Sequence, residues 1–433
     1  MSVKEARGWG PGASLTRAAN GIRRTLAAGT ESLRPDRRAL FAGFVLGDNR
    51  GQPPEVVSDF RASGLTHLLV VSGENVAFVL ALASPLLARL RLVSRVAVGL
   101  AVLVVFGTLV RWEPSVVRAE TMAALALFAS AMGRPISRLR LLALAITAVL
   151  LVDPLLVRSV GFLMSVGASA GIALVSPRVA ALLPGPRPLA SAMGVTIGAQ
   201  VGVAPILIPV FGGLPLASVP ANLLAVPAAG PIMMWGLGAG LPAGVVGGAV
   251  AHAVHIPTAI LVAWVAGVAR GAAALPLGEV DGPTALVLAG ALAVFVVARA
   301  RSQRVLVACA TALVILVGPV ALAVWPPACA GCRLDDGVRL WRAGDDVVLV
   351  VDTARSSSLL ARARHAGVRH VDVVVVTRPS APTLRAVDVL MSRIAVTRTV
   401  TAPGIVATAH FRVEVTPGPK GIEARVYSLR SLG

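Results

Sequence analysis

Hydrophobic residues are grouped in long runs over most of the chain, and short turns rich in Arg, Gly and Pro separate the runs. A helix needs about 20 apolar residues to cross a bilayer, and a lone apolar run in lipid must be helical to satisfy its backbone. The pattern therefore predicts a polytopic α-helical membrane protein with about nine to eleven transmembrane helices. The predicted spans are 65–88, 92–110, 114–132, 138–157, 160–176, 191–211, 215–241, 247–274, 284–298 and 305–325.

The pattern changes at residue 330 to that of a small α/β domain. The stretch "VRLWRAGDDVVLVVDTA" predicts two strands joined by a Gly-Asp turn, and "VDVVVVT" predicts a buried strand. "SSSLLARARHAG" predicts a helix that ends at Gly367, and "LRAVDVLMSRI" predicts another. "HFRVEV" and "EARVYSL" alternate as edge strands do. We therefore divide the chain into a basic segment 1–38, a membrane domain 39–325 and an α/β domain 330–433.

Composition agrees with a membrane protein, because 56% of the residues are hydrophobic, only 14% are charged and the mean hydropathy is +0.81. The net charge is +19, from 40 Lys and Arg against 21 Asp and Glu. This excess fits either positively charged cytoplasmic loops or attraction for a polyanion. Residues 1–38 contain no apolar core typical of a signal peptide.

Arginine-rich turns predict the orientation in the cytoplasmic membrane. Four such turns fall on one side, which we expect to be cytoplasmic, and the α/β domain 330–433 is then extracytoplasmic. The basic N-terminus also falls outside, against the rule, so it either rests on the surface or a segment near "RALFAGFVLG" is re-entrant. The arginines are Arg89, Arg91, Arg95, Arg134, Arg138, Arg140, Arg178, Arg187, Arg299, Arg301 and Arg304.

The first predicted span, "GLTHLLVVSGENVAFVLAL", carries polar side chains that are expensive in hydrocarbon. We predict that the helix is interrupted at Ser72-Gly73, and that His67, Ser72 and Asn75 face a polar cavity. On an unbroken helix His67 and Glu74 would share a face. The alternative is that Ser and Asn form interhelical hydrogen bonds and that the histidine is satisfied near the interface.

The three cysteines do not indicate a metal site. Cys309 lies inside an apolar run, and Cys329 and Cys332 form a single CxxC without the second ligand pair that zinc normally requires. A local disulfide or two free thiols remain as alternatives. We expect no metal and no cofactor.

The stretch "FVLGDNRGQPPEVVSDFRASGLTHLLVVSGENVAFV" resembles the core motif of the ComEC competence family, which reads like LGD followed by a helix and then GLxHLLAxSGxNV. The matching residues are Gly47, Asp48, Phe60, Gly64, Leu65, His67, Leu68, Ser72, Gly73, Asn75 and Val76. Three further motifs follow in the family's order, and the resemblance extends over roughly 15–425. "EPSVVRAETMA" is similar to SxxRAxxM, "DPLLVRSVGFLMSVGASAGI" to DPxxxxxxGFxLS, and "PLASVPANLLAVPAAGP" to NLLAxP. They place Ser115, Arg118, Met122, Asp153, Pro154, Gly161, Phe162, Ser165, Asn222 and Pro227.

This resemblance implies an inner-membrane channel for single-stranded DNA, with membrane lipid, single-stranded DNA and other competence proteins that supply DNA capture as partners. His67, Ser72, Gly73, Asn75, Arg118 and Asn222 are then the candidate substrate path.

Several of these residues also have a structural interpretation. Arg118 either approaches the same cavity as His67, or snorkels, or pairs with Glu113 or Glu120. Asp153 and Pro154 are typical of an N-cap followed by proline at the first helical position. Asn222 lies among prolines and predicts an interrupted helix, in which its amide satisfies freed backbone groups. The prolines are Pro220, Pro227 and Pro231.

The sequence departs from the family pattern in three places. We expect no OB-like domain before the core motif, and Glu74 stands where the family has a small or apolar residue. The α/β domain resembles half of a metallo-β-lactamase fold, in which the run after "VDVVVVT" is THxDxDH; here it is "TRPSAPT". The ligand positions hold Arg378, Ser380, Pro382 and Thr383, and only Asp352 keeps an acidic place.

None of those four side chains is a good zinc ligand, so we predict no activated water and no nuclease activity. The function predicted is passage of single-stranded DNA across the cytoplasmic membrane. One alternative is a remnant of such a channel that has a structural or binding role and does not transport. A second alternative is a secondary transporter of a small anion, which internal inverted repeats would have favoured.

Overall fold

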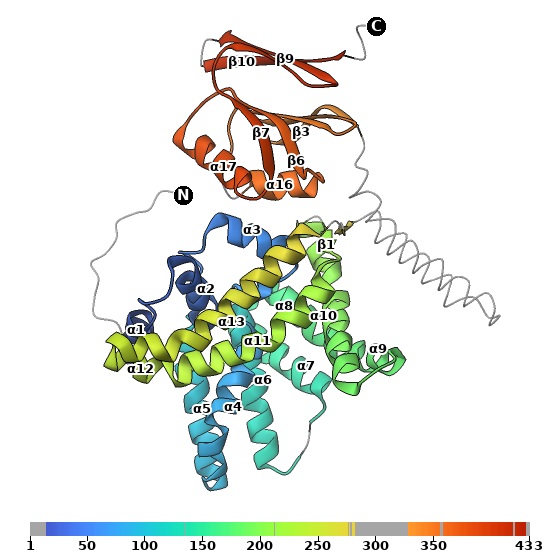
Figure 1. Cartoon of the computed structure of the whole chain (residues 1–433). Coiled ribbons are helices and arrows are strands. Elements are labelled where there is room, and N and C mark those ends of the chain that lie inside the picture. Colours follow the sequence, from blue (N-terminus) through green and yellow to red (C-terminus); the bar gives the residue numbers. More distant parts are fainter. Residues whose placement is uncertain are drawn as a thin grey trace, which may run out of the picture. The chain divides into compact units, whose positions relative to one another are not determined.

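The protein is described from a computed structural model, which covers residues 14–429 except 135, 212, 276, 278, 282–327, 356–357 and 419–420 (Figure 1). It forms two compact units. The first is drawn from 1–52, 65–210 and 219–268, and the second from 53–64, 211–218 and 269–433. The spans predicted at 284–298 and 305–325, the arginines between them and Cys309 lie outside the described residues.

The first unit is helical, and the helices follow the predicted spans closely. A pair of short 3-10 turns, η1 (Thr66–Leu68) and η2 (Pro154–Arg158), lies between them. The helices are α1 (Ser14–Gly29), α2 (Pro35–Leu46), α4 (Gly73–Ala88), α5 (Leu92–Leu109), α6 (Pro114–Ala131), α7 (Arg138–Val152), α8 (Val160–Leu174), α9 (Ser176–Leu182), α10 (Arg187–Phe211), α11 (Ser218–Gly238), α12 (Gly240–Val246) and α13 (Gly248–Ala274).

Fewer helices qualify as spans than we predicted. Within the described residues, only α5, α10, α11 and α13 are long and apolar enough to cross a membrane, and α8 with α9 adds a fifth if that bent pair is one span. The helices α4 and α7 have 16 and 15 residues, short of the ~20 that a bilayer requires. The helix α6 has 18 residues but carries two charges, Arg118 and Glu120, in its first half.

Helix ends fall where capping residues predict them. Gly47 adopts φ +69° at the end of α2, and its N–H donates to the Gly43 carbonyl, which is the αL motif of a helix C-terminus; the Asp48 N–H donates to the Ala42 carbonyl. The Asp153 carboxylate accepts a hydrogen bond from the Leu155 N–H at 3.0 Å, with Pro154 at the first position of η2. The capping role predicted for Asp153 and Pro154 is therefore confirmed.

The helix α11 corrects one expectation, because it runs unbroken from Ser218 to Gly238 through Pro227 and Pro231. Proline is tolerated inside a membrane helix when neighbouring groups satisfy the backbone it disturbs. Pro227 removes the usual donor of the Leu223 carbonyl. The indole of Trp264 in α13 donates to the next carbonyl, that of Leu224, at 2.9 Å, so a neighbouring helix bonds the backbone of α11 beside this proline. The interruption that we predicted around Asn222 is therefore wrong.

Glycines set the contact between α8 and α10. A Cβ on Gly171 would lie 2.1 Å from the Gly198 carbonyl oxygen, and one on Gly202 would lie 2.0 Å from the Gly167 carbonyl oxygen. Each helix thus presents two glycines four residues apart to the other, the small-residue pattern that lets membrane helices approach closely.

The second unit contains a mixed five-stranded sheet in the order β3-β4-β5-β6-β7. The strands β3 (Cys329–Asp335), β4 (Val338–Ala343) and β5 (Asp346–Val351) are antiparallel, and β5, β6 (His370–Val376) and β7 (Ala395–Val400) are parallel. Cys329 and Cys332 form a disulfide in β3, which is the first of the two alternatives left open above. The predicted Gly-Asp turn joins β4 to β5, with Gly344 at φ +57°.

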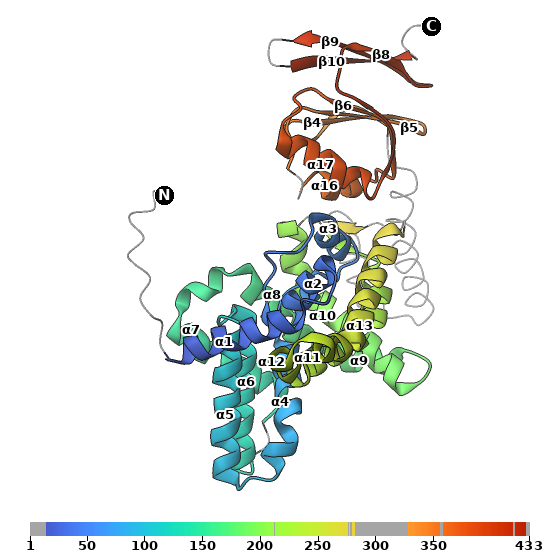
Figure 2. The ribbon, with the colours of Figure 1, turned by 60° about the vertical axis from the view of Figure 1, so that its left-hand side comes forward.

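Two hydrophobic layers enclose this sheet. The helices α16 (Leu359–His365) and α17 (Ala381–Met391) cover one face, and a sheet of β8 (Gly404–Ala407), β9 (Phe411–Gly418) and β10 (Gly421–Ser428) covers the other (Figure 2). Alternation along β5 explains this, because Leu349 faces the helices and Val348 faces β9. The strand β9 lies between β8 and β10, so it is not the edge strand that we predicted. The likeness to half of a metallo-β-lactamase fold stays a prediction.

The helix α3 (Pro54–Ala62) belongs to this second unit although it precedes the membrane helices in the chain. Its Asp59 is 2% exposed, and its carboxylate forms ion pairs with two arginines. Nη2 of Arg364 lies 2.8 Å from Oδ1, and Nε of Arg393 lies 3.0 Å from Oδ2. Arg364 also donates to the Ser58 hydroxyl at 3.0 Å. Because both arginines come from the α/β domain, a buried charge cluster fixes that domain to the segment between the LGD and GLTHLL parts of the core motif.

We predict that Gly171→Val destabilises the protein, because the added atoms collide with the backbone of α10 and overpacking of this kind costs about 1–3 kcal/mol. The thermal unfolding midpoint of the purified protein in detergent should fall by several degrees. Gly267→Val is the matched control, since a Cβ there meets nothing within 4 Å in another glycine-bearing membrane helix. Equal midpoints for the two variants would contradict the close packing of α8 and α10.

Candidate functional site

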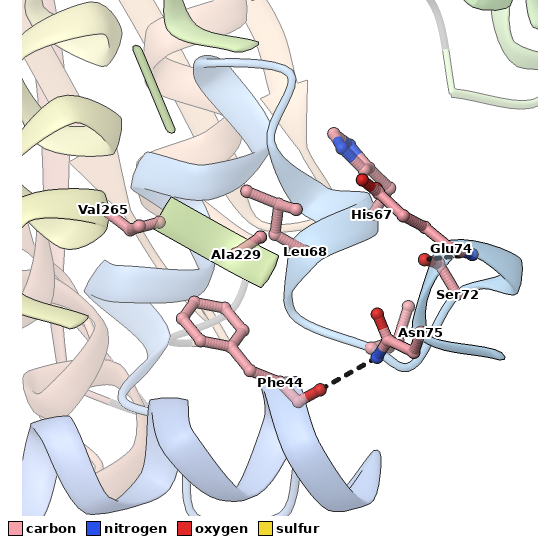
Figure 3. A pocket seen from close by; sticks show the side chains of 9 residues that line it. Phe44, His67, Leu68, Ser72, Glu74, Asn75, Ala229 and Val265 are labelled. Carbon is pink, nitrogen blue, oxygen red and sulfur yellow. Dashed lines mark hydrogen bonds between the residues drawn. The ribbon is translucent and has the colours of Figure 1, made fainter. Parts of the chain in front are cut away.

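A small polar cavity lies where the first predicted span is interrupted (Figure 3). Residues 69–72 are not helical, and α4 begins at Gly73 with Ser72 as its N-cap, so the predicted break at Ser72-Gly73 is confirmed. The cavity has a volume of about 20 Å³, which is room for about one water molecule. Its lining consists of Phe44, His67, Leu68, Val70, Ser72, Glu74, Asn75, Ala229 and Val265.

The polar side chains come to this cavity from both sides of the break. His67 stands in η1, and Ser72 and Asn75 stand at the beginning of α4. The Asn75 amide donates to the Phe44 carbonyl of α2 at 3.0 Å, and the Ser72 hydroxyl accepts from the Glu74 N–H at 3.3 Å. The prediction that His67, Ser72 and Asn75 line one cavity is confirmed, and their role as a substrate path stays a prediction.

Glu74 lines the same cavity as His67, but not because the two share a face of one helix. The break places them in separate elements, so the shared face that an unbroken helix would give does not form. Both side chains are largely exposed, whereas Ser72 and Asn75 are half-buried.

Behind the break, the second family motif contacts the first. The Ser115 hydroxyl donates to the Val71 carbonyl at 3.2 Å, which satisfies one backbone group that the missing helix leaves free. A Cβ on Gly73 would lie 2.8 Å from Nη2 of Arg118 and 3.0 Å from Cβ of Ala119. Glycine at position 73 is therefore what allows α6 to approach the beginning of α4.

Arg118 is buried at 6% exposure and joins the second motif to the third. Its Nε donates to the Ser165 hydroxyl at 2.9 Å, and its Nη1 lies 3.0 Å from Sδ of Met122. The side chain neither snorkels nor pairs with Glu113 or Glu120, so both structural alternatives for it are wrong. It is not part of the cavity lining and lies instead on the far side of Gly73.

The partners of Arg118 are electrically neutral. Within the described residues, no carboxylate oxygen lies within 4.0 Å of its guanidinium. A buried, unneutralised charge is costly, and a ligand of opposite charge would relieve that cost. Glu120, two residues along the same helix, is also buried, and its Oε1 has no hydrogen-bond partner among the described residues.

The remaining candidate residues lie elsewhere. Asn222 is buried in α11 at 8% exposure and does not line the cavity. Phe162 is 2% exposed in α8, whose N-cap Ser159 accepts a hydrogen bond from its N–H, and Gly161 lies beside it. Pro227 lies inside α11. These positions support packing.

Two motif residues shape the loops around α3. Gly64 adopts φ +72°, and a Cβ there would lie 2.3 Å from Cβ of Ser218, so both the turn and the close approach require glycine. Asp48 follows Gly47, the αL residue that ends α2. Its hydrogen bonds with the Arg50 side chain lower the pKa of its carboxyl to about 2, so Asp48 is ionised at neutral pH.

In the α/β domain, the positions that correspond to metal ligands form a different network. Arg378 pairs with Asp352 at 2.9 Å, and the Thr377 hydroxyl donates to the same carboxylate at 3.0 Å. Ser380 caps α17 by accepting from the Thr383 N–H, and Thr383 is 1% exposed. The described residues contain no group of three or more His, Cys, Asp or Glu that could hold a metal ion.

Comparison with known families identifies the chain at this point. Residues 44–323 match the family described as competence protein, and this match covers more than half of the sequence. The chain belongs to the competence protein family. The resemblance stated above from four ordered motifs is thereby confirmed. A search of curated proteins and a search of solved structures each give no significant match.

Membership in the competence protein family, together with four or five helices able to span a bilayer, makes this a membrane protein. Residues from three of the four motifs contact one another around Arg118. They are Gly73 from the first motif, Ser115, Arg118 and Met122 from the second, and Ser165 from the third. Sequence reasoning missed the carbonyls of Phe44 and Val71, because any residue can supply a backbone acceptor.

We predict that Ser165→Ala destabilises the protein because it removes the hydroxyl that accepts a hydrogen bond from the Arg118 guanidinium, a charged hydrogen bond worth about 1.5–3 kcal/mol. The thermal midpoint should fall by several degrees. Ser84→Ala is the control, since Ser84 is exposed and bonds only the Ala81 carbonyl of its own helix. The loss should shrink in an Arg118→Met background, and an undiminished loss there would contradict the coupling.

Proposed function

We propose that this protein passes single-stranded DNA across the cytoplasmic membrane. Family membership supports a role in DNA uptake. The observation that carries the proposal is Arg118, a buried guanidinium with neutral partners beside a broken membrane helix. Phosphate groups are the negative charges that would compensate it.

The beginning of α4 supports the same proposal. A helix N-terminus carries a partial positive charge and free N–H groups, and anions bind there. The polar groups of His67, Ser72 and Asn75 surround this end of the helix. The Glu74 carboxylate repels a polyanion unless it is protonated or paired with a positive group. We propose that His67 is the group that neutralises its charge.

One observation favours a second candidate function. The cavity of about 20 Å³ holds about one water and not a nucleotide, so transport requires the surrounding helices to separate. A remnant that keeps the family fold but does not transport would need no such opening.

We predict that His67→Ala and Asn75→Leu each abolish DNA uptake and leave membrane insertion intact, because both remove polar groups from the cavity without touching the long apolar helices. The measurement is internalisation of labelled DNA into a DNase-resistant form, in the host deleted for this gene and complemented with each variant. Membrane fractions report insertion. His370→Ala, a partly exposed histidine in the α/β domain, is the matched control.

Two results would decide against the proposal in different ways. If uptake depends on the protein yet survives both substitutions, the cavity is not on the DNA path. If uptake does not depend on the protein at all, the non-transporting alternative is correct.

We further propose that the α/β domain is extracytoplasmic and has no hydrolytic metal centre. The ion pair of Arg378 with Asp352 and the capping role of Ser380 and Thr383 support the second statement, because these groups are bonded to one another and do not fit a zinc ion.

We predict that the purified full chain, incubated with excess Zn²⁺ or Mn²⁺ and then desalted, retains far less than one metal ion per chain and cleaves no single-stranded DNA. Elemental analysis and a nuclease assay measure the two properties. Asp352→Ala is the comparison variant, and it should not differ from the unmodified protein. Stoichiometric metal that disappears in Asp352→Ala, together with cleavage, would overturn the prediction.

A further inference from the structure

A second and larger cavity, of about 150 Å³, lies in the first unit between the turn that joins α1 to α2 and the first half of α13. It is separate from the cavity at the broken helix, and none of the family motifs quoted above contributes to it. Its lining consists of Ser32, Leu33, Arg34, Arg37, His252, His255, Ile256 and Ala259.

His255 is the unusual member of this lining. Its side chain is fully buried, yet neither ring nitrogen has a hydrogen-bond partner. Phe41 packs edge-on against the ring at 5.6 Å, and Cβ atoms on Gly29 or Gly240 would approach the ring to 3.3 Å. A buried imidazole normally has its polar atoms satisfied, so two unpaired nitrogens beside a cavity indicate a missing polar ligand.

The other polar side chains around the cavity are those of Ser32 and of three basic residues, Arg34, Arg37 and His252. Arg34 and Arg37 come from the beginning of α2, whose N-terminus has no side-chain cap, and His252 lies one turn before His255. Asp36 is the nearest described counter-charge and pairs with Arg34 at 3.5 Å, at an exposed position. Two arginines, two histidines and a helix N-terminus together favour an anion.

Position along α13 limits what this anion can be. A helix of 27 residues is about 40 Å long, whereas the hydrocarbon core is about 30 Å thick, so α13 extends beyond the core at one end or at both. His252 and His255 stand within the first eight residues of α13. When the excess length lies at this end of the helix, the cavity is level with lipid phosphates.

An apolar surface leads away from the cavity. Ile256, Ile260 and Trp264 are spaced four residues apart and are 48%, 63% and 52% exposed, so they form one stripe along α13. Any membrane helix presents apolar residues to lipid. This stripe differs in that its first residue, Ile256, also lines the basic cavity, so a headgroup in the cavity would direct its acyl chain along the stripe.

We propose that this cavity binds the phosphate headgroup of an anionic phospholipid. Arg34 and Arg37 contribute charge, and the uncapped end of α2 and the His255 ring contribute N–H groups to the phosphate oxygens. The stripe from Ile256 to Trp264 holds an acyl chain.

The test measures lipid binding to the full chain purified in detergent, by native mass spectrometry with phosphatidylglycerol and with phosphatidylcholine of the same chains. Phosphatidylglycerol should remain bound and phosphatidylcholine should not. Arg34→Gln with Arg37→Gln should weaken phosphatidylglycerol binding about thirtyfold, since each basic residue near an anionic lipid contributes a factor of about five. Arg17→Gln with Arg24→Gln removes the same charge from exposed positions of α1 and should change little.

His255→Phe separates ligand binding from folding. It keeps an aromatic ring against Phe41 but removes both nitrogens, so phosphatidylglycerol binding should fall about tenfold while the lipid-free thermal midpoint does not fall. Unchanged binding in this variant, or equal losses in the two arginine pairs, would overturn the proposal.

Two further probes distinguish the source of the phosphate. Inorganic phosphate that competes as well as phosphatidylglycerol would show that no lipid is required. A thymidine oligonucleotide that displaces the lipid, with affinity that depends on Arg34 and Arg37, would assign the cavity to nucleic acid. Either result overturns the lipid proposal, whereas failure of both probes to compete supports it.

Discussion

The buried charge of Arg118 is the constraint on which the arrangement of the competence motifs depends. Its guanidinium contacts Ser165 of α8 and Met122 of α6, and a Cβ on Gly73 of α4 would lie 2.8 Å from its Nη2. Three segments that are far apart in the sequence are thus fixed around one positive charge. The free energy needed to bury such a charge without a carboxylate partner is large. An anion beside Arg118 would therefore be stabilised by its positive charge.

A second charge cluster, formed by Asp59, Arg364 and Arg393, has a structural role. Asp59 is buried with two arginines and is fully compensated, so it attracts no ligand and acts as a structural joint within the second unit. Loss of one partner from a buried pair usually costs more than the pair contributes, which makes such joints specific. Because α3 lies between two halves of the core motif, this joint connects the α/β domain to that motif within the second unit.

The sequence was sufficient for those features that depend on local chemistry. The break at Ser72-Gly73, the Asp153 cap and the strands of the α/β domain follow from residue type and spacing, and the structure agrees. The sequence was insufficient for contacts between residues that are far apart along the chain. The indole of Trp264 supports α11 beside its proline, and the Ser165 hydroxyl holds Arg118, yet neither pairing is visible in one sequence. Within the described residues, fewer helices can span a membrane than we predicted, in part because the apolar runs extend beyond the beginning of α4 and the end of α7 into the short 3-10 turns η1 and η2.

The interruption before α4 also determines how the site can open. A continuous helix resists bending because each turn is hydrogen-bonded to the next, whereas residues 69–72 make no such ladder. The beginning of α4 is packed against α6 at Gly73 and is bonded to α2 through Asn75. The Asn75 amide bonds the Phe44 carbonyl, and a hydrogen bond of this kind contributes only about 0.5–1.5 kcal/mol. Movement of α4 away from α2 would therefore break this bond without breaking a helical hydrogen bond.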